Sequence, residues 1–462
     1  MGRYFATLCL VVTVVVAAPA IRPPDPGVGG AVSAAPGAPN IVFIVMDDLR
    51  VDDWPAVMPK TWRLFGQEGT NFTNFFANTP LCCPQRASFL SGRYAHNHNV
   101  KINGDPNGVA GFDQAATFNG YLQAAGYRTG MAGKLLHPWQ PLTRNPIGWD
   151  RWAVTESQYW SGNFNVNGVV KKLAGYNTKV LGDEAVADVR AWEPSDAQPW
   201  ALYLTPKAPH APYAAETKYA KTDVGTWSGN PAVAEANVTD KPPAVTWRPV
   251  GSLADAQALR AKQLRTLLSV DDMIGRLFDE LTALGEAQNT LAVFTSDNGY
   301  LWGEHRVYGE KRFPYTQSVK IPYLMRWPGH VAAGATDGRL LSGIDVLPTF
   351  LDATGVQPNL VYPLDGRSIF APGGRSRVLL EYFLSPDLKV PSWSSTRTST
   401  YQYVEWYSTT GAVTFREYYD AATDPWQLTN LYKDGIAAND PPIAPLSAAL
   451  AADRACAGSG CP

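Results

Sequence analysis

The sequence predicts an α/β fold, a large and mostly parallel central sheet flanked by helices, followed by a smaller C-terminal domain on a short antiparallel sheet. Three observations predict it. Short apolar runs rich in β-branched residues are typical of strands buried on both faces. Helical patterns lie between these runs, as in alternating α/β folds. From about residue 375 the chain changes to short aromatic and β-branched stretches, which favour antiparallel strands.

Three apolar runs are the expected parallel strands: residues 40–46, 199–205 and 291–296. Polar side chains follow each of them, namely Asp47-Asp48, His210 and Asp297-Asn298. Open α/β sheets place their sites beyond the carboxyl ends of parallel strands. The sequence therefore predicts one site that collects these side chains.

Helices are expected at residues 258–284, with leucines at helical spacing before Gly285, and at 345–353, with Pro348 in the first turn. The C-terminal strands are expected at residues 378–383, 401–407 and 414–419. No internal repeat is present.

Composition restricts the class of protein. The 462 residues are 45% hydrophobic and 17% charged, as in a folded globular protein. The 39 basic and 41 acidic residues give a net charge of −2, so no overall field favours nucleic acid or an anionic membrane. Anion binding must therefore be local, and no nucleic-acid partner is expected.

The N-terminus has the layout of a secretory signal, with Arg3, an apolar run and a small-x-small site at Ala18-Pro19-Ala20. An uncleaved anchor is the alternative. We expect a signal peptide at residues 1–20, a flexible leader at 21–39 and a secreted or extracytoplasmic protein without stable membrane insertion after cleavage. Cys456 and Cys461 suit a local disulfide in an exported protein.

The segment 82–93 carries the strongest chemical pattern: Cys-Cys-Pro-Gln-Arg-Ala-Ser-Phe-Leu-Ser-Gly-Arg. Pro84 suits the first turn of a helix and Gly92 its end, which places Cys82 at a helix N-terminus, where an anion is favoured. Arg86 adds a fixed positive charge one turn on. A buried structural cysteine is the alternative on physical grounds alone.

The pattern Cys82-x-Pro84-x-Arg86, followed by Leu90-Ser91-Gly92-Arg93, resembles the signature of the type I sulfatase family, which has an alkaline-phosphatase-like fold. The resemblance implies that a formylglycine-generating enzyme oxidises Cys82 to formylglycine, whose hydrate is the nucleophile. Gln85 departs from the serine or alanine most common in the family. Counted from Cys83, the Pro and Arg offsets fail, so Cys83 is expected to pack nearby.

Asp47-Asp48 and Asp297-Asn298 suggest a metal site. Adjacent carboxylates repel unless a cation lies between them, and such oxygen donors suit Ca²⁺ or Mg²⁺. Capping and turn residues are the alternative interpretation. The resemblance implies that Asp47, Asp48, Asp297 and Asn298 bind calcium, with magnesium as the alternative ion and the residue derived from Cys82 as a further ligand.

Lysines and histidines complete the expected site. Gly133-Lys134 resembles the motif whose lysine contacts the sulfate, and His137 lies three residues after that lysine where many members have two. Pro209-His210 resembles the segment whose histidine assists the leaving group. The stretch 303–312 resembles the family segment after the second metal motif. The resemblance implies Lys311 as the second sulfate-binding lysine, with Arg312 as the competing candidate, and the stretch includes His305 as a substrate-binding candidate.

The resemblance continues to about Leu431. From the change of sequence near residue 375, we expect a catalytic sulfatase domain at 40–374, a small α+β domain at 375–440 and a tail at 441–462. Leu81-Cys82-Cys83-Pro84 together with the stretch 96–99, which contains His98 as a substrate-binding candidate, looks most like N-acetylglucosamine-6-sulfatases. A sulfated carbohydrate or an aryl sulfate is the implied substrate.

In the implied mechanism, the metal and Arg86 hold the formylglycine hydrate, Asp297 accepts its proton, Lys134 and Lys311 hold the sulfate, and His210 assists the leaving group. His137 is a candidate base for the second step. The nearest rival is a phosphonate monoester or phosphodiester hydrolase with the same nucleophile. A glycan-binding protein with a decayed site and a two-zinc phosphatase are further alternatives.

Overall fold

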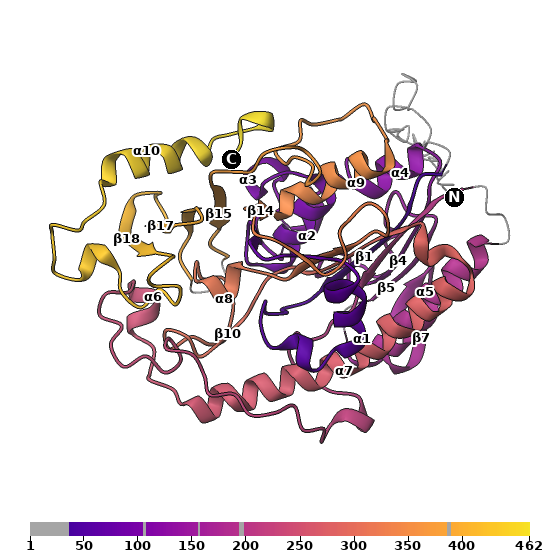
Figure 1. Cartoon of the computed structure of the whole chain (residues 1–462), viewed down its shortest axis with the longest axis horizontal. Helices are drawn as coiled ribbons and strands as arrows, with labels where there is room; N and C mark the ends of the chain where they lie inside the picture. The colour runs from indigo at the N-terminus through magenta and orange to yellow at the C-terminus, as the bar shows by residue number, and fades with distance from the viewer. Residues whose placement is uncertain (1–36, 105–107, 156–157, 194–197, 386–389) are drawn as a thin grey trace, which may run out of the picture.

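The structure is a computed structural model that describes residues 37–104, 108–155, 158–193, 198–385 and 390–462. The expected signal peptide at 1–20, and the leader up to residue 36, lie outside the described residues. A ten-stranded mixed sheet forms the body of the molecule (Figure 1), in the order β13-β2-β12-β9-β1-β8-β4-β5-β6-β7. The domain boundaries at 374/375 and 440/441 stay predictions.

The centre of this sheet is parallel, antiparallel pairs flank it on both sides, and the edge strand β13 pairs parallel with β2. Strands β9, β1, β8, β4 and β5 run parallel to one another. On either side of them, β12 pairs antiparallel with β9, and β6 pairs antiparallel with β5. The strands of the sheet are β1 (Asn40–Met46), β2 (Thr70–Phe72), β4 (Arg128–Gly133), β5 (Arg151–Thr155), β6 (Trp160–Val166), β7 (Val169–Tyr176), β8 (Trp200–Thr205), β9 (Thr290–Ser296), β12 (Tyr323–Arg326) and β13 (Ala335–Asp337). The three expected parallel strands are present and adjacent.

Helices cover both faces of the sheet (Figure 1). Alternate residues of β1 point to opposite faces: Phe43 packs in one core with residues of α2, α4 and α9. Ile44 packs in the other with residues of α5 and α7. The helices are α1 (Pro59–Thr61), α2 (Cys82–Ser91), α3 (Ala95–His98), α4 (Phe118–Ala124), α5 (Asn177–Trp192), α6 (Pro243–Thr246), α7 (Leu253–Ala283), α8 (Thr316–Val319), α9 (Val346–Thr354) and α10 (Ile443–Asp453).

Both expected helices are confirmed, and α7 begins five residues before its predicted start. Ser252 caps it by accepting a hydrogen bond from the backbone N–H of Asp255. Such a cap stabilises a helix start by about 1 kcal/mol. The leucine spacing identified the buried face, whereas the exposed first turn carries no apolar period.

A second sheet of four antiparallel strands follows toward the C-terminus, with β15 (Val378–Tyr382), β16 (Trp393–Arg397), β17 (Tyr401–Tyr407) and β18 (Val413–Asp420). The expected fold class is thus confirmed. Aromatic residues of this sheet share a core with Leu81 and Phe313 of the main body. Two-stranded pairs β3 (Phe75–Phe76) with β14 (Leu341–Ser342), and β10 (Leu301–Trp302) with β11 (Tyr308–Glu310), complete the strands.

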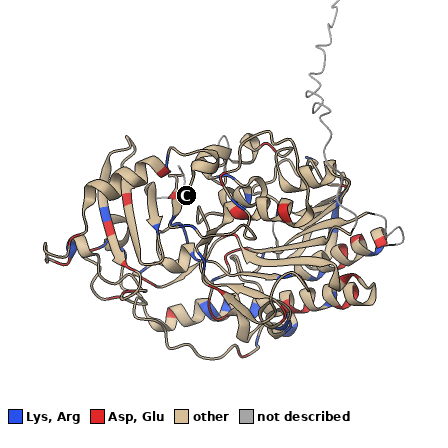
Figure 2. Ribbon diagram, turned by 45° about the horizontal axis from the view of Figure 1, so that its top comes forward, with Lys and Arg blue, Asp and Glu red and all other residues tan. Residues whose placement is uncertain are grey.

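The expected local disulfide joins Cys456 to Cys461. The tail it closes lies against the segment that follows α2, because Tyr94 Oη donates to the carbonyl of Pro462 at 2.9 Å. Acidic and basic residues occur on the same helices (Figure 2), in keeping with the balanced composition. Within the described residues, none of the helices combines the length and apolar content required to cross a bilayer.

Candidate active site

The candidate site lies beyond the carboxyl ends of four neighbouring strands, β9, β1, β8 and β4. The sheet ladder continues just past the strand ends and fixes the first residues of the site. The backbone N–H of Asp297 donates to Met46 O at 3.0 Å, and that of Lys134 donates to Thr205 O at 3.0 Å. Asp47 forms a parallel bridge with Pro209. The sheet therefore brings together side chains from distant parts of the sequence.

Glycine is required immediately before Lys134. Gly133 has φ of 122°, a conformation that side chains disfavour. A Cβ atom at this position would lie 2.1 Å from the carbonyl oxygen of Thr205. The close approach of β4 to β8 at this point sets where Lys134 leaves the sheet.

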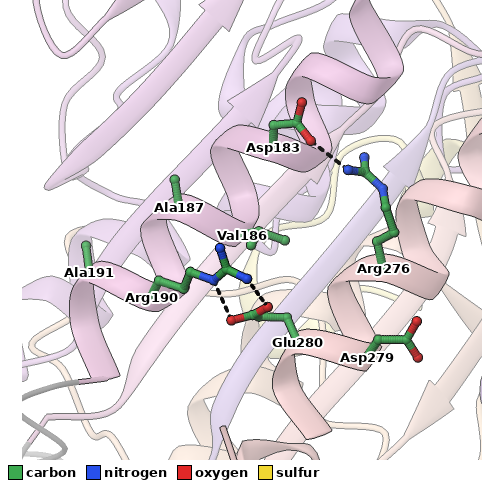
Figure 3. A pocket seen from close by; sticks show the side chains of 8 residues that line it. All are labelled: Asp183, Val186, Ala187, Arg190, Ala191, Arg276, Asp279 and Glu280. Carbon is green, nitrogen blue, oxygen red and sulfur yellow. Dashed lines mark hydrogen bonds and ion pairs between the residues drawn. The ribbon is translucent and has the colours of Figure 1, made fainter. Parts of the chain in front are cut away.

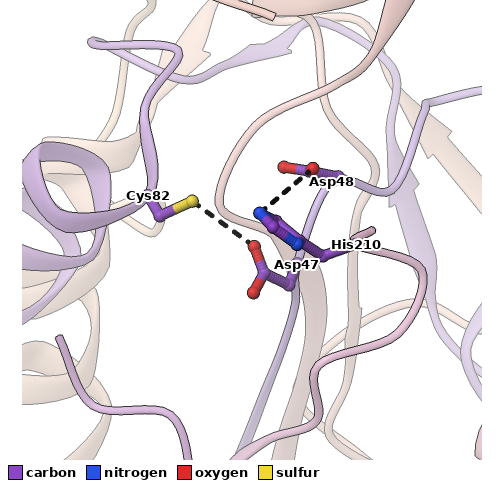
Figure 4. Close-up of side chains that lie close together, drawn as sticks. All are labelled: Asp47, Asp48, Cys82 and His210. Atoms are coloured by element: carbon purple, nitrogen blue, oxygen red, sulfur yellow. Dashed lines mark hydrogen bonds and ion pairs between the residues drawn. The ribbon is translucent and has the colours of Figure 1, made fainter. Parts of the chain in front are cut away.

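Cys82 is the first residue of α2, preceded by Leu81 in extended conformation, and Gly92 ends the helix with φ of 66°. Its Sγ accepts from Lys311 Nζ at 2.9 Å and donates to Asp47 Oδ1 at 3.4 Å. Figure 4 shows Cys82 pointing from the helix toward Asp47. Burial raises the pKa of the Cys82 thiol to about 12. At neutral pH the unmodified side chain is thus a thiol, which is a poor nucleophile.

Three carboxylates and three cations pair around Cys82. Lys134 Nζ lies 2.6 Å from Asp47 Oδ2, and Lys311 pairs with Asp48. Arg86 Nε donates to Asp297 Oδ2 at 2.8 Å. All six side chains are buried. Because the charges balance, an added divalent cation would leave a net positive site suited to an anionic substrate.

The two central carboxylates differ in their electrostatics. Burial opposes ionisation of Asp47, but the charges of Lys134, His210, Arg86 and Lys311 outweigh it and hold its pKa well below the usual range. Burial, together with the charge of Asp47, raises the pKa of Asp297. Two neighbouring carboxyl groups with opposed shifts are typical of functional sites.

A group of potential metal ligands is present at this edge. One ligand atom each from Asp47, Asp48, Cys82 and His210 lies within 4.8 Å of the others (Figure 4). Asp297 is outside this compact group, since Arg86 and the backbone N–H of Asp48 occupy its carboxylate.

Asn298 supplies an oxygen with no protein partner. Its Nδ2 donates to Asp48 Oδ1 at 2.7 Å, whereas its Oδ1 is buried and accepts no hydrogen bond from the described residues. A buried acceptor without a partner is costly in a folded protein. Together with two aspartates it fits a hard, oxygen-seeking divalent cation.

Two histidines lie beside the carboxylates. His210 Nε2 is 3.8 Å from Asp48 Oδ2, and its side chain is 31% exposed, which opens it toward solvent. Burial, and then the charge of Lys134, lowers the pKa of His137 to about 4, so its imidazole is neutral at neutral pH. The structure thus places both expected histidines next to the charged cluster.

Lys311 reaches Cys82 and its neighbour Arg312 does not. Arg312 turns away to pair with Glu310, and its carbonyl accepts from Trp393 Nε1 at 2.8 Å. Of the two candidates considered from the sequence, Lys311 is the one in the cluster.

His305 and His98 lie outside the cluster. His305 is fully buried, with Nδ1 2.7 Å from Glu235 Oε2 and its ring tilted against Tyr315.

Both ring nitrogens of His98 are occupied, by Ser88 Oγ at 3.0 Å and by the backbone N–H of Val100 at 3.1 Å. Ser88 is six residues along α2 from Cys82, about 9 Å along the helix axis. The structure does not bring His98 to the site.

Cys83 has a different role from Cys82. Its Sγ accepts from the backbone N–H of His137 at 2.9 Å and contacts His137 O at the same distance. Its own N–H donates to Asn103 Oδ1 at 3.0 Å. Cys83 therefore packs against the loop that carries Lys134 and His137. The sequence predicted nearby packing but not this contact.

Lys207 also lies at the site and was not identified from the sequence. It begins the turn after β8, where the N–H of His210 donates to Lys207 O at 2.9 Å. The charges of Asp47, Asp48 and Lys134 act on its ammonium group. Its place three residues before His210, after a predicted strand, was the available signal.

A surface depression lies between α5 and α7, away from this cluster (Figure 3). Its charged side chains pair with one another, Arg190 with Glu280 and Arg276 with Asp183. None of its lining residues belongs to the cluster around Cys82, so this depression adds nothing to the chemistry.

The fold and the cluster define an α/β protein with a buried site of paired acidic and basic side chains at the carboxyl ends of its central strands. The sulfatase family profile matches residues 39–356, and that of the C-terminal region of N-sulphoglucosamine sulphohydrolase matches residues 303–443. The chain belongs to the sulfatase family. The family expectation from the Cys82 segment is thereby confirmed.

Curated relatives agree with this assignment. Human N-acetylglucosamine-6-sulfatase is 31% identical over 382 residues, which cover 76% of this chain and 68% of the relative. The extracellular sulfatase SULF-1 homolog of Drosophila melanogaster is 34% identical over 359 residues. That match covers 73% of this chain but 31% of the fly protein, so the chain matches about a third of that relative's length.

Solved structures share the fold. One, in complex with its substrate D-glucosamine-2-N,6-O-disulfate, has a TM-score of 0.73 at 23% identity and covers 90% of this chain and 96% of its own. A phosphonate monoester hydrolase of Agrobacterium radiobacter has a TM-score of 0.69, also at 23% identity, with the same coverage of both chains. At this level of identity the likeness concerns the fold.

Proposed function

We propose that the protein is a sulfuric ester hydrolase whose nucleophile is a formylglycine made from Cys82 by a formylglycine-generating enzyme. The observation that carries the proposal is the position of Cys82, at the N-terminus of α2 and in contact with Lys311 and Asp47. Because the buried thiol is protonated at neutral pH, the unmodified residue does not suit this position as a nucleophile. A formylglycine hydrate would supply two hydroxyl groups, one to attack sulfur and one to release the sulfate afterwards.

The chain's own residues supply the remaining functions. Lys134 and Lys311 neutralise the sulfate oxygens and hold them in place. Asp297, whose pKa is raised by burial, accepts the proton of the attacking hydroxyl. Arg86 orients that carboxylate through its 2.8 Å hydrogen bond.

His210 and His137 are proposed to handle the protons of the two later events. His210 is 31% exposed and lies 3.8 Å from Asp48, and its proposed role is to assist departure of the alcohol. His137 is neutral at neutral pH and is the candidate base for release of the sulfate. His305 is proposed to hold the segment that follows β10 in place through Glu235 rather than to touch substrate.

Calcium is proposed as the resident cation, with magnesium as the alternative. Asp47, Asp48 and Asn298 would hold it, with Asp297 and residue 82 as further ligands. The ion would supply positive charge for the sulfate and for residue 82. Oxygen donors favour these ions over zinc.

The proposed substrate is a sulfated carbohydrate of the N-acetylglucosamine-6-sulfate type, or an aryl sulfate. This rests on the relatives, among which are N-acetylglucosamine-6-sulfatases and an arylsulfatase from Volvox carteri. We propose a secreted or extracytoplasmic location, supported by the signal-like N-terminus and by relatives named extracellular sulfatases.

Phosphonate hydrolysis is the second candidate, because phosphonate monoester hydrolases share the fold. A side-by-side assay of sulfated sugars, aryl sulfates and phosphonate monoesters separates the two, on protein whose Cys82 peptide mass shows conversion. We expect kcat/KM to be highest on a sulfate ester. A higher kcat/KM on a phosphonate would replace the proposal.

A further inference from the structure

Lys207 lies three residues before His210. The two residues share one turn, which is closed by the hydrogen bond from His210 N–H to Lys207 O. Tyr159 lies against both, since Lys207 Nζ is 5.8 Å from its ring centroid and Tyr159 Oη donates to His210 O at 2.7 Å. The aromatic ring therefore supports the turn and limits where the lysine can point.

The charge of Lys207 interacts with the charged and titratable residues of the site. Burial lowers the pKa of Lys207, while the charges of Asp47 and Asp48 act in the opposite direction. Lys207 in turn contributes to the lowered pKa of His137. The half-buried Lys207 side chain is thus close enough for its charge to act on Asp47, Asp48 and His137.

Lys207 differs from the other cations of the site in having no carboxylate partner. Arg86, Lys134 and Lys311 each contact an aspartate. Within the described residues, Lys207 makes neither a hydrogen bond nor an ion pair through its ammonium group. Its ammonium group contacts the ring of Tyr159. A partly buried cation without a negatively charged partner is unfavourable, and an anion from outside the protein would compensate it.

We propose that Lys207 binds a second anionic group of the substrate, a sulfate or a carboxylate on the sugar, and so determines specificity for polyanionic saccharides. The transferred sulfate already has Lys134 and Lys311. Lys207 lies instead beside His210, the residue assigned to the departing alcohol, and therefore faces the sugar. This inference rests on the proposed function and names the substrate class of the same site.

The test compares substrates that differ by one charge. N-acetylglucosamine 6-sulfate is assayed against N-acetylglucosamine 3,6-disulfate and against a disaccharide that joins the 6-sulfated sugar to a uronic acid. The latter two distinguish a second sulfate from a carboxylate. Lys207→Met removes the charge, Lys207→Arg keeps it, and Lys221→Met removes an exposed lysine farther along the same loop.

We expect the wild-type enzyme to prefer at least one doubly anionic substrate. Lys207→Met should reduce that preference in kcat/KM by about tenfold, mainly through KM, because one charge pair in a partly desolvated site is lost. Lys207→Arg and Lys221→Met should keep it. An equal loss on all substrates, no loss on any, or no wild-type preference would overturn the inference.

Binding separates this inference from the proposed function. The affinities of Cys82→Ala and of the double variant Cys82→Ala/Lys207→Met for the same sugars are measured by calorimetry. A preference for the doubly anionic sugar that depends on Lys207 supports the inference even if the wild-type protein turns over none of them. That absence of turnover would count against the proposed function alone. Equal affinities in the two proteins would overturn the role of Lys207.

Discussion

Lys311 Nζ lies 2.9 Å from Cys82 Sγ, although the two residues are 229 positions apart in the chain. Lys311 also pairs with Asp48, so it joins residue 82 to the carboxylates that follow β1. The neighbouring Cys83 sends its sulfur to the backbone of His137 instead. Two adjacent cysteines therefore have separate tasks, one in the charged cluster and one in packing of a loop.

This difference predicts that alanine substitution mainly affects turnover at Cys82 and stability at Cys83. Cys82→Ala should abolish turnover, by about 10⁴-fold or more, as expected for loss of a nucleophile. Cys83→Ala should keep measurable turnover and lower the free energy of unfolding by about 1–2 kcal/mol, because it removes the contact with His137. Turnover of an aryl sulfate and thermal unfolding are measured on both proteins. Full activity of purified Cys82→Ala would contradict the assignment.

The metal site predicts that the cation stabilises the protein. Calcium at about 100 times its Kd should raise the free energy of unfolding by about 2.7 kcal/mol. Asn298→Ala removes the buried Oδ1 that lacks a protein partner and should weaken calcium binding about tenfold or more.

The control for this prediction is Asn74→Ala, because the Asn74 amide bonds to the backbone of Gly338 and not to the cluster. Calorimetry on chelator-treated protein measures both affinities. Calcium binding by Asn298→Ala equal to that of wild type would remove Asn298 from the ligand set.

The sequence predicted the central strands because each is a continuous apolar run, as strands buried on both faces require. It did not predict β4, whose Gly130 and Gly133 interrupt that pattern. Both glycines are required by close packing, against Trp192 and against Thr205. β16 was not predicted either. Ser394 and Ser395 interrupt the apolar pattern of this strand, which is buried between β15 and β17.

The candidate site likewise contains residues that the sequence predicted and residues that it did not. Residues with a family motif, such as Cys82, Lys134 and His210, were predicted from the sequence and lie together in the structure. Lys207 belongs to no family motif. It shares a turn with His210, and neither strand pairing nor helix and strand propensities predict that turn. His98 has a motif-like segment but lies beyond Ser88, because α2 carries it away from the cluster.

Asp188 predicts a pH dependence of stability. It is buried on α5 and paired with Arg151, and burial nevertheless raises its pKa to about 6. Between about pH 4 and 6 the folded protein binds a proton that the unfolded chain has released, so this group makes stability fall as pH rises. Asp188→Asn should remove this group's contribution, which is a fall of about 2 kcal/mol in the free energy of unfolding between pH 4 and 7.

The control is Asp183→Asn on the same helix. Asp183 is about half exposed and its pKa is lowered by its partners Lys179 and Arg276 despite partial burial, so its contribution has the opposite sign. Denaturant unfolding of the three proteins at pH 4 and 7 gives the slopes. A similar change in both variants would show that burial of Asp188 is not the cause.

Gly133 and Gly126 allow steric contact to be separated from backbone strain. Both have positive φ, 122° and 94°, so alanine is strained at either position. A Cβ on Gly126 would meet nothing within 4 Å, whereas on Gly133 it would lie 2.1 Å from Thr205 O. Gly126→Ala should therefore cost about 1–2 kcal/mol of stability and leave kcat/KM close to wild type.

Gly133→Ala must push β4 away from β8 at the residue before Lys134, whose N–H donates to the same Thr205 carbonyl. A displacement of about 1 Å in Lys134, the lysine proposed to hold the sulfate, is expected to lower kcat/KM by about 100-fold. Thermal unfolding and kcat/KM are measured on both variants. If Gly133→Ala loses stability but retains the kcat/KM of Gly126→Ala, then the position of Lys134 does not depend on this contact, and its role in holding the sulfate is weakened.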